Sequence, residues 1–242
     1  MTATTYTRYE LLRTFRNVRF MFLSIVFPLV LFLLVAGPNR DKHLGGLPFP
    51  LYYMTGMIAW GAMAAMLSCG SRIATERAVG WNRQLRITPL SPRSYFRAKV
   101  ATAYALASLT IVLLYAAGVA LGVRMSAGDW FEMTGLILVG LVPFAALGVV
   151  LGHLLTPEAV GPAIGGATAL LALLGGAYGP VATSGALNDL VRLLPSYWLV
   201  QAAHVSIGSG AWGAEGWLVV LVWTVVLTRL AAWCYRRDTQ RV

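Results

Sequence analysis

The sequence predicts an all-α integral membrane protein, and two observations carry this prediction. Hydrophobic residues make up 58% of the 242 residues and charged residues only 12%, whereas charged residues approach a quarter of a typical soluble domain. Several apolar runs of roughly twenty residues are long enough to cross a bilayer as helices. Only short polar segments separate most of these runs, so we expect a single transmembrane domain over residues 1–242.

The first apolar run, residues 20–37, is expected to stay in the protein as the first span. Four arginines precede it: Arg8, Arg13, Arg16 and Arg19. The run is longer than the apolar part of a signal peptide. Apolar residues also recur at helical spacing before it: Leu11, Leu12, Phe15, Val18 and Phe22. This pattern favours an amphipathic helix in the headgroup region over a simple extension of the span, and Pro28 should kink the span.

Five further spans are expected in the rest of the chain. Their predicted bounds are 51–71, 98–123, 130–152, 160–178 and 216–235. Ser91 followed by Pro92, and Thr156 followed by Pro157, each place an N-cap residue before a proline at the first helical position. The helix of the third span therefore begins well outside the bilayer.

Glycines spaced four residues apart occur in several of these spans. Examples are Gly148 with Gly152, and Gly161 with Gly165. Such pairs put small residues on one helix face and predict close approach of neighbouring helices.

Residues 179–213 form an ambiguous segment. Its middle, 187–207, is long enough to span a bilayer but contains six polar or helix-breaking residues: Asn188, Asp189, Arg192, Pro195, Gln201 and His204. Such a helix would be too costly against lipid. We therefore expect two short helices, broken at Pro195, that enter the outer leaflet without crossing it.

The distribution of basic residues supports six spans across a cell membrane, with both termini on the cytosolic side. In that arrangement fifteen of the nineteen basic residues, seven of them in residues 72–99, share the cytosolic side, as the positive-inside rule requires. A seventh span through 187–207 would place the C-terminal arginines outside. The net charge of +10 is explained by this orientation, so we expect no binding to nucleic acid.

The sequence contains few candidate catalytic or metal-binding residues. Cys69 and Cys234 lie in or at the end of apolar runs, which indicates buried side chains rather than a disulfide or a metal site. His43, His153 and His204 lie in separate connections without metal-ligand spacing. The predicted spans contain no pair of carboxylates and no acid–histidine relay. The chain also lacks a phosphate-binding GxxxxGK[ST] motif, so we expect no ATPase activity, metal or cofactor in this chain.

Two groups of residues match the pattern of a known family. The first is Glu76-Arg77, Gly80, Leu85, Thr88-Pro89, Leu90-Ser91-Pro92 and Lys99. The second is Gly175-Gly176-Ala177-Tyr178-Gly179-Pro180 with Leu194-Pro195-Ser196-Tyr197-Trp198. Both groups resemble ABC-2-type transporter permeases, the membrane subunits of type-2 ATP-binding-cassette exporters such as drug exporters. With the six predicted spans, the resemblance covers essentially the whole chain.

The resemblance implies a dimeric permease, expected to be a homodimer, that works with two copies of a separate ATPase subunit. That subunit would bind the ATP and Mg. It also implies a short coupling helix, about Gly80 to Ile87, that docks on the ATPase. The residues assigned to this coupling segment are Glu76, Gly80, Trp81, Arg83, Leu85, Arg86, Thr88 and Pro89.

Within the coupling segment, Trp81 and Leu85 would make apolar contacts, and Arg83 and Arg86 polar ones. Family members often carry an acidic residue where this chain has Arg83, which changes the electrostatics of docking. On its residues alone, the same segment could also be a solvated loop whose arginines only orient the protein.

The resemblance places the translocation route at the dimer axis, between the second and fifth spans. The residues expected to line it are Tyr53, Met57, Trp60, Gly161, Gly165 and Thr168. Aromatic and methionine surfaces suit amphipathic or apolar cargo, although ordinary packing is the alternative for each residue. The outer re-entrant segment is expected to include Tyr178, Pro180, Pro195 and Tyr197.

The sequence therefore predicts the permease subunit of an ATP-driven exporter that moves a hydrophobic or amphipathic molecule. Membrane lipid, the ATPase subunit and a second permease copy are the expected partners. An exporter of lipid-linked polysaccharide or lipid is an alternative of the same class. A lipid-modifying membrane enzyme and a non-transporting membrane anchor are alternatives of other classes.

Overall fold

The computed structural model describes residues 3–18, 22–44, 46–80, 91–179, 184–207 and 212–240. The described chain is nearly all helical, as predicted for an all-α membrane protein. It includes one small hairpin, in which strand β1 (His43–Leu44) pairs antiparallel with strand β2 (Leu47–Pro48).

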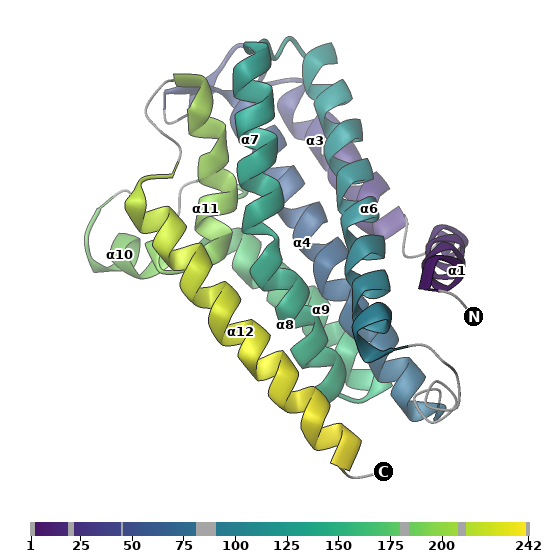
Figure 1. Cartoon of the computed structure of the whole chain (residues 1–242). Helices are drawn as coiled ribbons and strands as arrows, with labels where there is room; N and C mark the ends of the chain where they lie inside the picture. The colour runs from purple at the N-terminus through teal and green to yellow at the C-terminus, as the bar shows by residue number, and fades with distance from the viewer. Residues whose placement is uncertain are drawn as a thin grey trace.

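Five helical segments among the described residues are long and apolar enough to cross a membrane. They are α4 (Phe49–Ala78), α6 (Pro92–Ala120), α7 (Ala127–Gly140) continued by α8 (Val142–Leu154), α9 (Pro157–Leu174) and α12 (Ala214–Gln240) (Figure 1). Each overlaps one of the spans predicted from residue 51 onward. The predicted single helix over 130–152 is divided at Leu141, because Pro143 has no N–H to continue the hydrogen-bond ladder.

The apolar run predicted as the first span is shorter and less regular in the structure. A π-helix, η1 (Phe22–Val26), leads into α3 (Phe27–Ala36). The helical hydrogen bonding changes from π to α at Phe27, directly before Pro28, whose ring and missing N–H disturb the preceding turn.

The two predicted helix starts are confirmed. The backbone N–H of Ser94 donates to the Ser91 hydroxyl at 3.2 Å and caps α6, and the N–H of Ala159 donates to the Thr156 hydroxyl at 3.4 Å and caps α9. At the other end, α4 stops just before Gly80, whose φ of 71° lies in the left-handed region that favours glycine.

Helix α4 lies at the centre of the bundle, where it packs against α3, α6, α8, α9 and α11. Within its most apolar stretch 78% of the residues are buried, compared with 17% for α9 and 22% for α12. The latter two helices therefore leave broad apolar faces uncovered by the described chain. Lipid or another protein chain must cover such faces in a membrane.

Glycines allow α4 and α8 to approach closely, as predicted for Gly148 and Gly152. A Cβ atom added to Gly70 would lie 2.2 Å from the carbonyl oxygen of Gly148, and one added to Gly152 would lie 2.6 Å from the carbonyl oxygen of Gly70. By contrast, Gly161 and Gly165 on α9 meet no other described atom within 4 Å of an added Cβ. That pair mediates no helix contact within the described chain.

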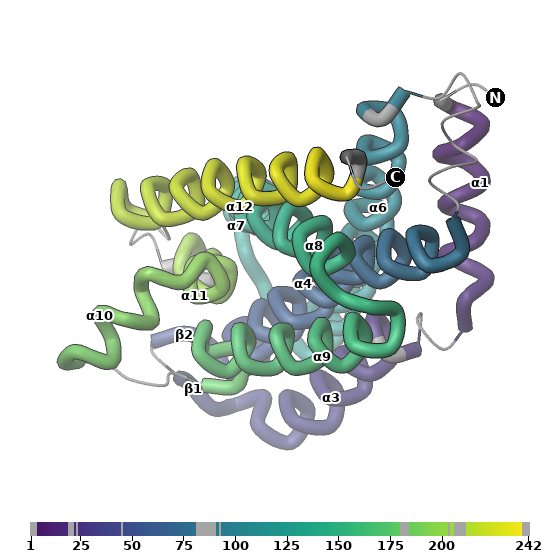
Figure 2. Tube along the Cα trace, turned by 90° about the horizontal axis from the view of Figure 1, so that it is seen from below, coloured from purple at the N-terminus to yellow at the C-terminus, as the bar shows by residue number. Residues whose placement is uncertain are grey.

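Helix α1 (Ala3–Phe15) runs across the direction of the long helices. Figure 1 looks at it nearly end-on, and Figure 2, turned by 90°, shows its full length beside α6 and the last turns of α4. We call the end of the bundle where α4 ends and α6 begins the basic end, because Arg72, Arg77, Arg93 and Arg97 lie there.

We call the end of the bundle where α4 begins the opposite end. Two short helices lie against the side of the bundle, between that end and its middle (Figure 1). They are α10 (Ala186–Arg192) and α11 (Pro195–Gln201), followed by a 3-10 turn, η2 (Ala202–Ile207). The break predicted at Pro195 is thus present. The indole N–H of Trp198 donates to the carbonyl of Arg192 at 2.8 Å, which fixes α10 against α11.

The close contact of α4 and α8 makes a prediction about stability. Replacing Gly70 with Ala should destabilise the protein by about 1–3 kcal/mol, because the added methyl group forces the two backbones apart. Gly135→Ala in α7 is the matched control, since its added Cβ meets no described atom within 4 Å. Thermal denaturation in detergent measures both variants, and equal midpoints would contradict this account of the contact.

Candidate functional site

Glu76 and Arg77 are consecutive residues near the end of α4, and their side chains enter two separate networks of ion pairs. We call them the Lys99 network and the Asp238 network after the residue at the centre of each. Together they connect the end of α4 to four other helices.

Lys99 bridges two carboxylates from different helices. Its Nζ atom lies 2.6 Å from Oε1 of Glu10 on α1 and 2.6 Å from Oε1 of Glu76 on α4. All three side chains are buried, with exposed fractions of 0% for Lys99, 1% for Glu10 and 3% for Glu76. Charges buried to this degree are stable only when they are paired, so each of these three groups depends on the others.

Three further side chains complete the Lys99 network. Nη1 of Arg72 donates to Oε1 of Glu10 at 2.9 Å, and the Tyr95 hydroxyl donates to Oε2 of Glu76 at 2.6 Å. Nη1 of Arg13, which is half exposed, reaches Oε1 of Glu76 at 3.2 Å. Three cations and two carboxylates from α1, α4 and α6 thus meet at one place.

The pattern of α1 explains why Glu10 points into the bundle. Tyr6, Glu10 and Thr14 are spaced four residues apart, so they share one helix face, and all three are buried. The opposite face carries Tyr9 and Leu12, which are 57% and 54% exposed. Helix α1 therefore binds the bundle through a largely polar face and leaves its apolar residues outside.

The charges around Glu10 also set its protonation. Burial by itself would raise the pKa of the Glu10 carboxyl group, but Lys99 and Arg72 outweigh that effect and hold the pKa below its ordinary value of 4.5. Glu10 is therefore ionised at neutral pH and is a strong partner for both cations.

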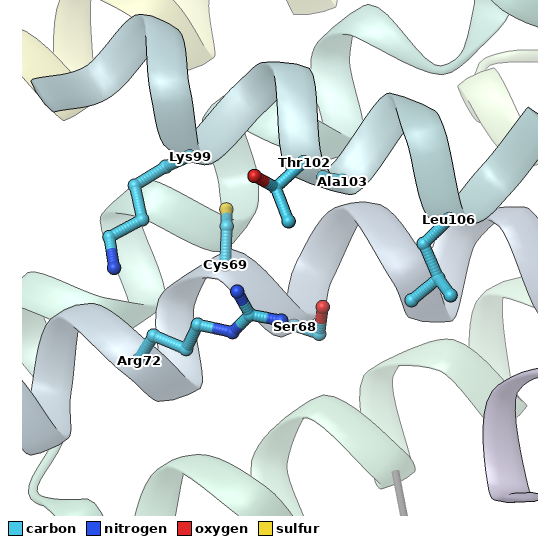
Figure 3. Close-up of a pocket in the computed structure, with 7 residues that line it drawn as sticks. All are labelled: Ser68, Cys69, Arg72, Lys99, Thr102, Ala103 and Leu106. Carbon is cyan, nitrogen blue, oxygen red and sulfur yellow. The ribbon is translucent and has the colours of Figure 1, made fainter. Parts of the chain in front are cut away.

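Figure 3 shows Lys99 and Arg72 at a small gap between α6 and α4, with Ser68, Cys69 and Thr102 among the lining residues. The gap has no room for a water molecule. Lys99 and Arg72 both bind the Glu10 carboxylate, so this gap is part of the packing of the two helices and not a ligand pocket.

The Asp238 network joins α4 to α8 and α12. Nε of Arg77 lies 2.7 Å from Oδ2 of Asp238 on α12, and Nη1 of Arg77 donates to the carbonyl of Gly152 on α8 at 2.9 Å. The Nδ1 atom of His153 lies 2.6 Å from the same Asp238 oxygen. The rings of Phe96 and Tyr235 pack beside His153.

These contacts define what we call the α4 junction: Glu76 and Arg77 with their ion partners. Through Glu76 the end of α4 is joined to α1 and α6, and through Arg77 it is joined to α8 and α12. The junction lies a single turn before Gly80 and the predicted coupling segment.

The predicted coupling residues fall into two groups. Glu76 belongs to the α4 junction, and its buried carboxylate faces Lys99 and Tyr95 rather than solvent. Gly80 ends α4. The other six lie in 81–90, outside the described residues: Trp81, Arg83, Leu85, Arg86, Thr88 and Pro89.

The residues predicted to line the translocation route do not share one open surface in this structure. Met57 is fully buried and Tyr53 nearly so, while Trp60 packs on Phe27 with ring centres 5.2 Å apart. On α9, Gly161 and Gly165 are exposed, whereas Thr168 is buried. Of the residues predicted for the outer re-entrant segment, Tyr178 is exposed, Pro195 buried and Tyr197 half-buried, and Pro180 lies outside the described residues.

At the opposite end of the bundle, α4 holds the turn that follows α9. The Tyr52 hydroxyl donates to the carbonyl of Gly176 at 2.7 Å. A Cβ atom added to Gly56 would lie 2.1 Å from the carbonyl oxygen of Ala177, so only glycine allows the two backbones to approach this closely. Helix α4 thus contacts the second family-like motif at one end and carries the first at the other.

Sequence reasoning missed most of the α4 junction. The predicted spans hold no carboxylate pair, yet the fold brings Glu10 and Glu76 together from segments outside them. His153, expected in a connection, lies in α8 and pairs with Asp238. One signal was available: Lys99 falls inside a predicted span, where an unpaired lysine would be costly.

The fold and this site define a multi-span α-helical membrane protein with an ion-paired junction at its basic end. A sequence model described as "ABC-2 family transporter protein" matches residues 46–233. The chain therefore belongs to the ABC-2 family of transporter proteins and is the membrane subunit of an ABC transporter. Members of this family are transmembrane subunits that generally work with an ABC ATPase subunit and are not ATPases themselves.

A curated relative agrees with this assignment. The chain is 26% identical over 244 residues to a protein of Bacillus subtilis (strain 168) named "Putative transport permease YvfS", and the match covers 96% of each chain.

The Lys99 network makes a prediction about stability. Lys99→Met should destabilise the protein by about 3–5 kcal/mol, because it leaves two buried carboxylates short of their shared cation. Lys42→Met is the matched control, since Lys42 is exposed and its removal should leave the midpoint nearly unchanged. Thermal denaturation in detergent measures both, and similar midpoints would show that Lys99 does not hold the network together.

Glu10 makes a prediction about pH. Because its pKa is lowered on docking, the ionised carboxylate stabilises α1 on the bundle above the ordinary pKa of 4.5, and this contribution is lost as the pH falls through the lowered value. A spin label on the outer face of α1 at Tyr9→Cys should keep the same mobility from pH 8 to pH 5 and become more mobile in stronger acid. A mobility change confined to the range above pH 6 would contradict the assignment to Glu10.

Proposed function

We propose that the chain is the permease subunit of an ATP-driven exporter for a hydrophobic or amphipathic molecule, and that segment 81–90 docks on a separate ATPase subunit. The observation that carries this proposal is the α4 junction. It joins the helix end next to that segment to α1, α6, α8 and α12 through buried or half-buried charges. A junction of this kind suits a protein that receives force at one point and distributes it.

The dimensions of α4 support the proposal. Its 30 residues correspond to about 45 Å of helix, enough to cross a bilayer. One end carries the junction, and the other holds Gly176 and Ala177 after α9. A movement of α4 that starts at segment 81–90 would thus change the packing of the turn at the opposite end.

The proposed orientation places the basic end on the cytosolic side of a cell membrane. Six spans then follow, with residues 20–37 as the first, both termini cytosolic, and α10 and α11 entering the outer leaflet. The exposed Tyr9 and Leu12 of α1 favour a position of this helix in the cytosolic headgroup region.

The cargo route is proposed at the axis of a homodimer that works with two ATPase copies. The uncovered face of α9 supports this, because Gly161 and Gly165 leave room for a second chain to approach. Tyr53, Met57 and Trp60 are apolar or aromatic and would suit an apolar cargo. Because Met57 is fully buried, it would meet cargo only in a state in which α4 has parted from its neighbours.

The test is co-purification with an ATP-binding-cassette ATPase, sought first among the products of the reading frames next to the one that encodes this chain. Wild-type permease should retain that ATPase, change its rate of ATP hydrolysis and export cargo. Trp81→Asp and Leu85→Asp should abolish ATPase retention and transport while leaving membrane insertion intact, since a carboxylate replaces an apolar docking contact.

Phe131→Asp provides the matched control for these variants. Phe131 is an exposed aromatic residue at the opposite end of the bundle, so its replacement should leave ATPase retention unchanged. Undiminished retention in Trp81→Asp and Leu85→Asp would exclude segment 81–90 as the docking site. A permease that never alters ATP hydrolysis would instead favour a non-transporting anchor.

A further inference from the structure

The contacts of α1 raise a question that docking of segment 81–90 alone does not answer. Helix α1 packs mainly on α6 and lies outside the bundle of long helices (Figure 2). Its apolar residues Tyr9, Leu12 and Phe15 are exposed, while Glu10 is buried. A helix that served only as a membrane anchor would have no need to place its acidic residue in the centre of an ion network.

The Lys99 network contains residues from both helices that flank segment 81–90, α4 before it and α6 after it. Glu76 lies four residues before Gly80, where α4 has ended, and Lys99 lies two turns after α6 begins at Pro92. The same Nζ atom contacts Glu76 and Glu10 at 2.6 Å. Helices α4 and α6, which flank the segment, and helix α1 are therefore joined by one group of buried charges.

A buried centre of this type resists separation. Moving α1 away from α4 and α6 would strip Glu10 of Lys99 and Arg72, its two cationic partners, and leave a carboxylate unpaired in a site from which water is excluded. Moving the three helices together breaks none of these contacts. The favoured response to a force on segment 81–90 is thus a joint displacement.

We infer that Lys99 is a positioning residue which, through Glu10 and Glu76, makes α1 move with the ATPase-coupling segment. This inference rests on the proposed function, because it takes segment 81–90 as the point where force is applied. It assigns α1 to the moving part of the transporter, where its exposed face displaces lipid at the cytosolic headgroup level during each cycle.

Two distances within the permease–ATPase complex test the inference. One pair of spin labels, Val79→Cys and Ala159→Cys, reports the position of the end of α4 relative to α9. The other pair, Tyr9→Cys and Ala159→Cys, reports the position of α1; all three residues are exposed. Excess unlabelled permease limits each assembly to one labelled chain, and pulsed electron resonance measures each distance with and without ATP under conditions that block hydrolysis.

In the wild-type background both distances should shift when ATP binds. In Glu10→Gln the Val79 distance should still shift, while the Tyr9 distance should lose its shift, because α1 no longer follows Lys99. Glu132→Gln is the matched control: Glu132 is an exposed glutamate on α7, and both shifts should remain.

Each alternative outcome has a defined meaning. A Tyr9 shift that is absent in the wild type, or that persists in Glu10→Gln, overturns the inference. Loss of both shifts in Glu10→Gln overturns it as well, because Glu10 would then support the whole assembly rather than link α1. Absence of both shifts in the wild type, with the ATPase bound, would count against the proposed function itself.

A second variant tests the inference independently in case Glu10→Gln does not fold. The double replacement Glu10→Leu with Lys99→Met exchanges the Glu10–Lys99 ion pair for apolar side chains, which keeps the site packed and removes both of these buried charges together. Arg72, which loses Glu10, is 19% exposed and can turn to solvent. Glu76 retains Arg13 and Tyr95 as partners. This variant should bind the ATPase and again lose only the Tyr9 shift, and a retained Tyr9 shift would overturn the inference.

Discussion

The buried contact of Lys99 with two carboxylates is the constraint on which the basic end of this protein depends. Glu10, Glu76 and Lys99 come from three helices and are all removed from water, so none can be displaced alone without leaving an unpaired charge. Arg77 adds a second set of contacts through Asp238 and Gly152. The last turns of α4 are therefore fixed to α1, α6, α8 and α12, directly before segment 81–90, the segment that we propose docks on the ATPase.

The same helix is fitted tightly along its length. Gly70 lets α8 approach α4 near the junction, and Gly56 lets the turn after α9 approach it at the opposite end. This helix of 30 residues, about 45 Å long, is thus held by close backbone contacts near both ends and by ion pairs at the basic end. Around α4, helices α9 and α12 have uncovered apolar faces, and these faces are where lipid or a second chain would contact the bundle.

Local chemistry allowed much of the fold to be predicted from the sequence. Ser91-Pro92 and Thr156-Pro157 mark helix starts through capping. The ion networks could not be predicted, because Glu10 and Lys99 are 89 residues apart and meet only after α1 has packed on α6. The burial of Met57, a residue predicted to line the route, could not be foreseen for a related reason: helical spacing identifies a shared face of α4 but not the neighbours that cover it.

The central claim is that α4 carries movement from the basic end to the opposite end. The most direct measurement is the distance between labels at Tyr178→Cys in the turn after α9 and Trp217→Cys in the first turn of α12, two exposed positions, in the complex with the ATPase. We predict that this distance changes when ATP binds and that Trp81→Asp abolishes the change. A distance that stays constant in the wild type, while labels at Val79 report movement of the other end of α4, would contradict the account.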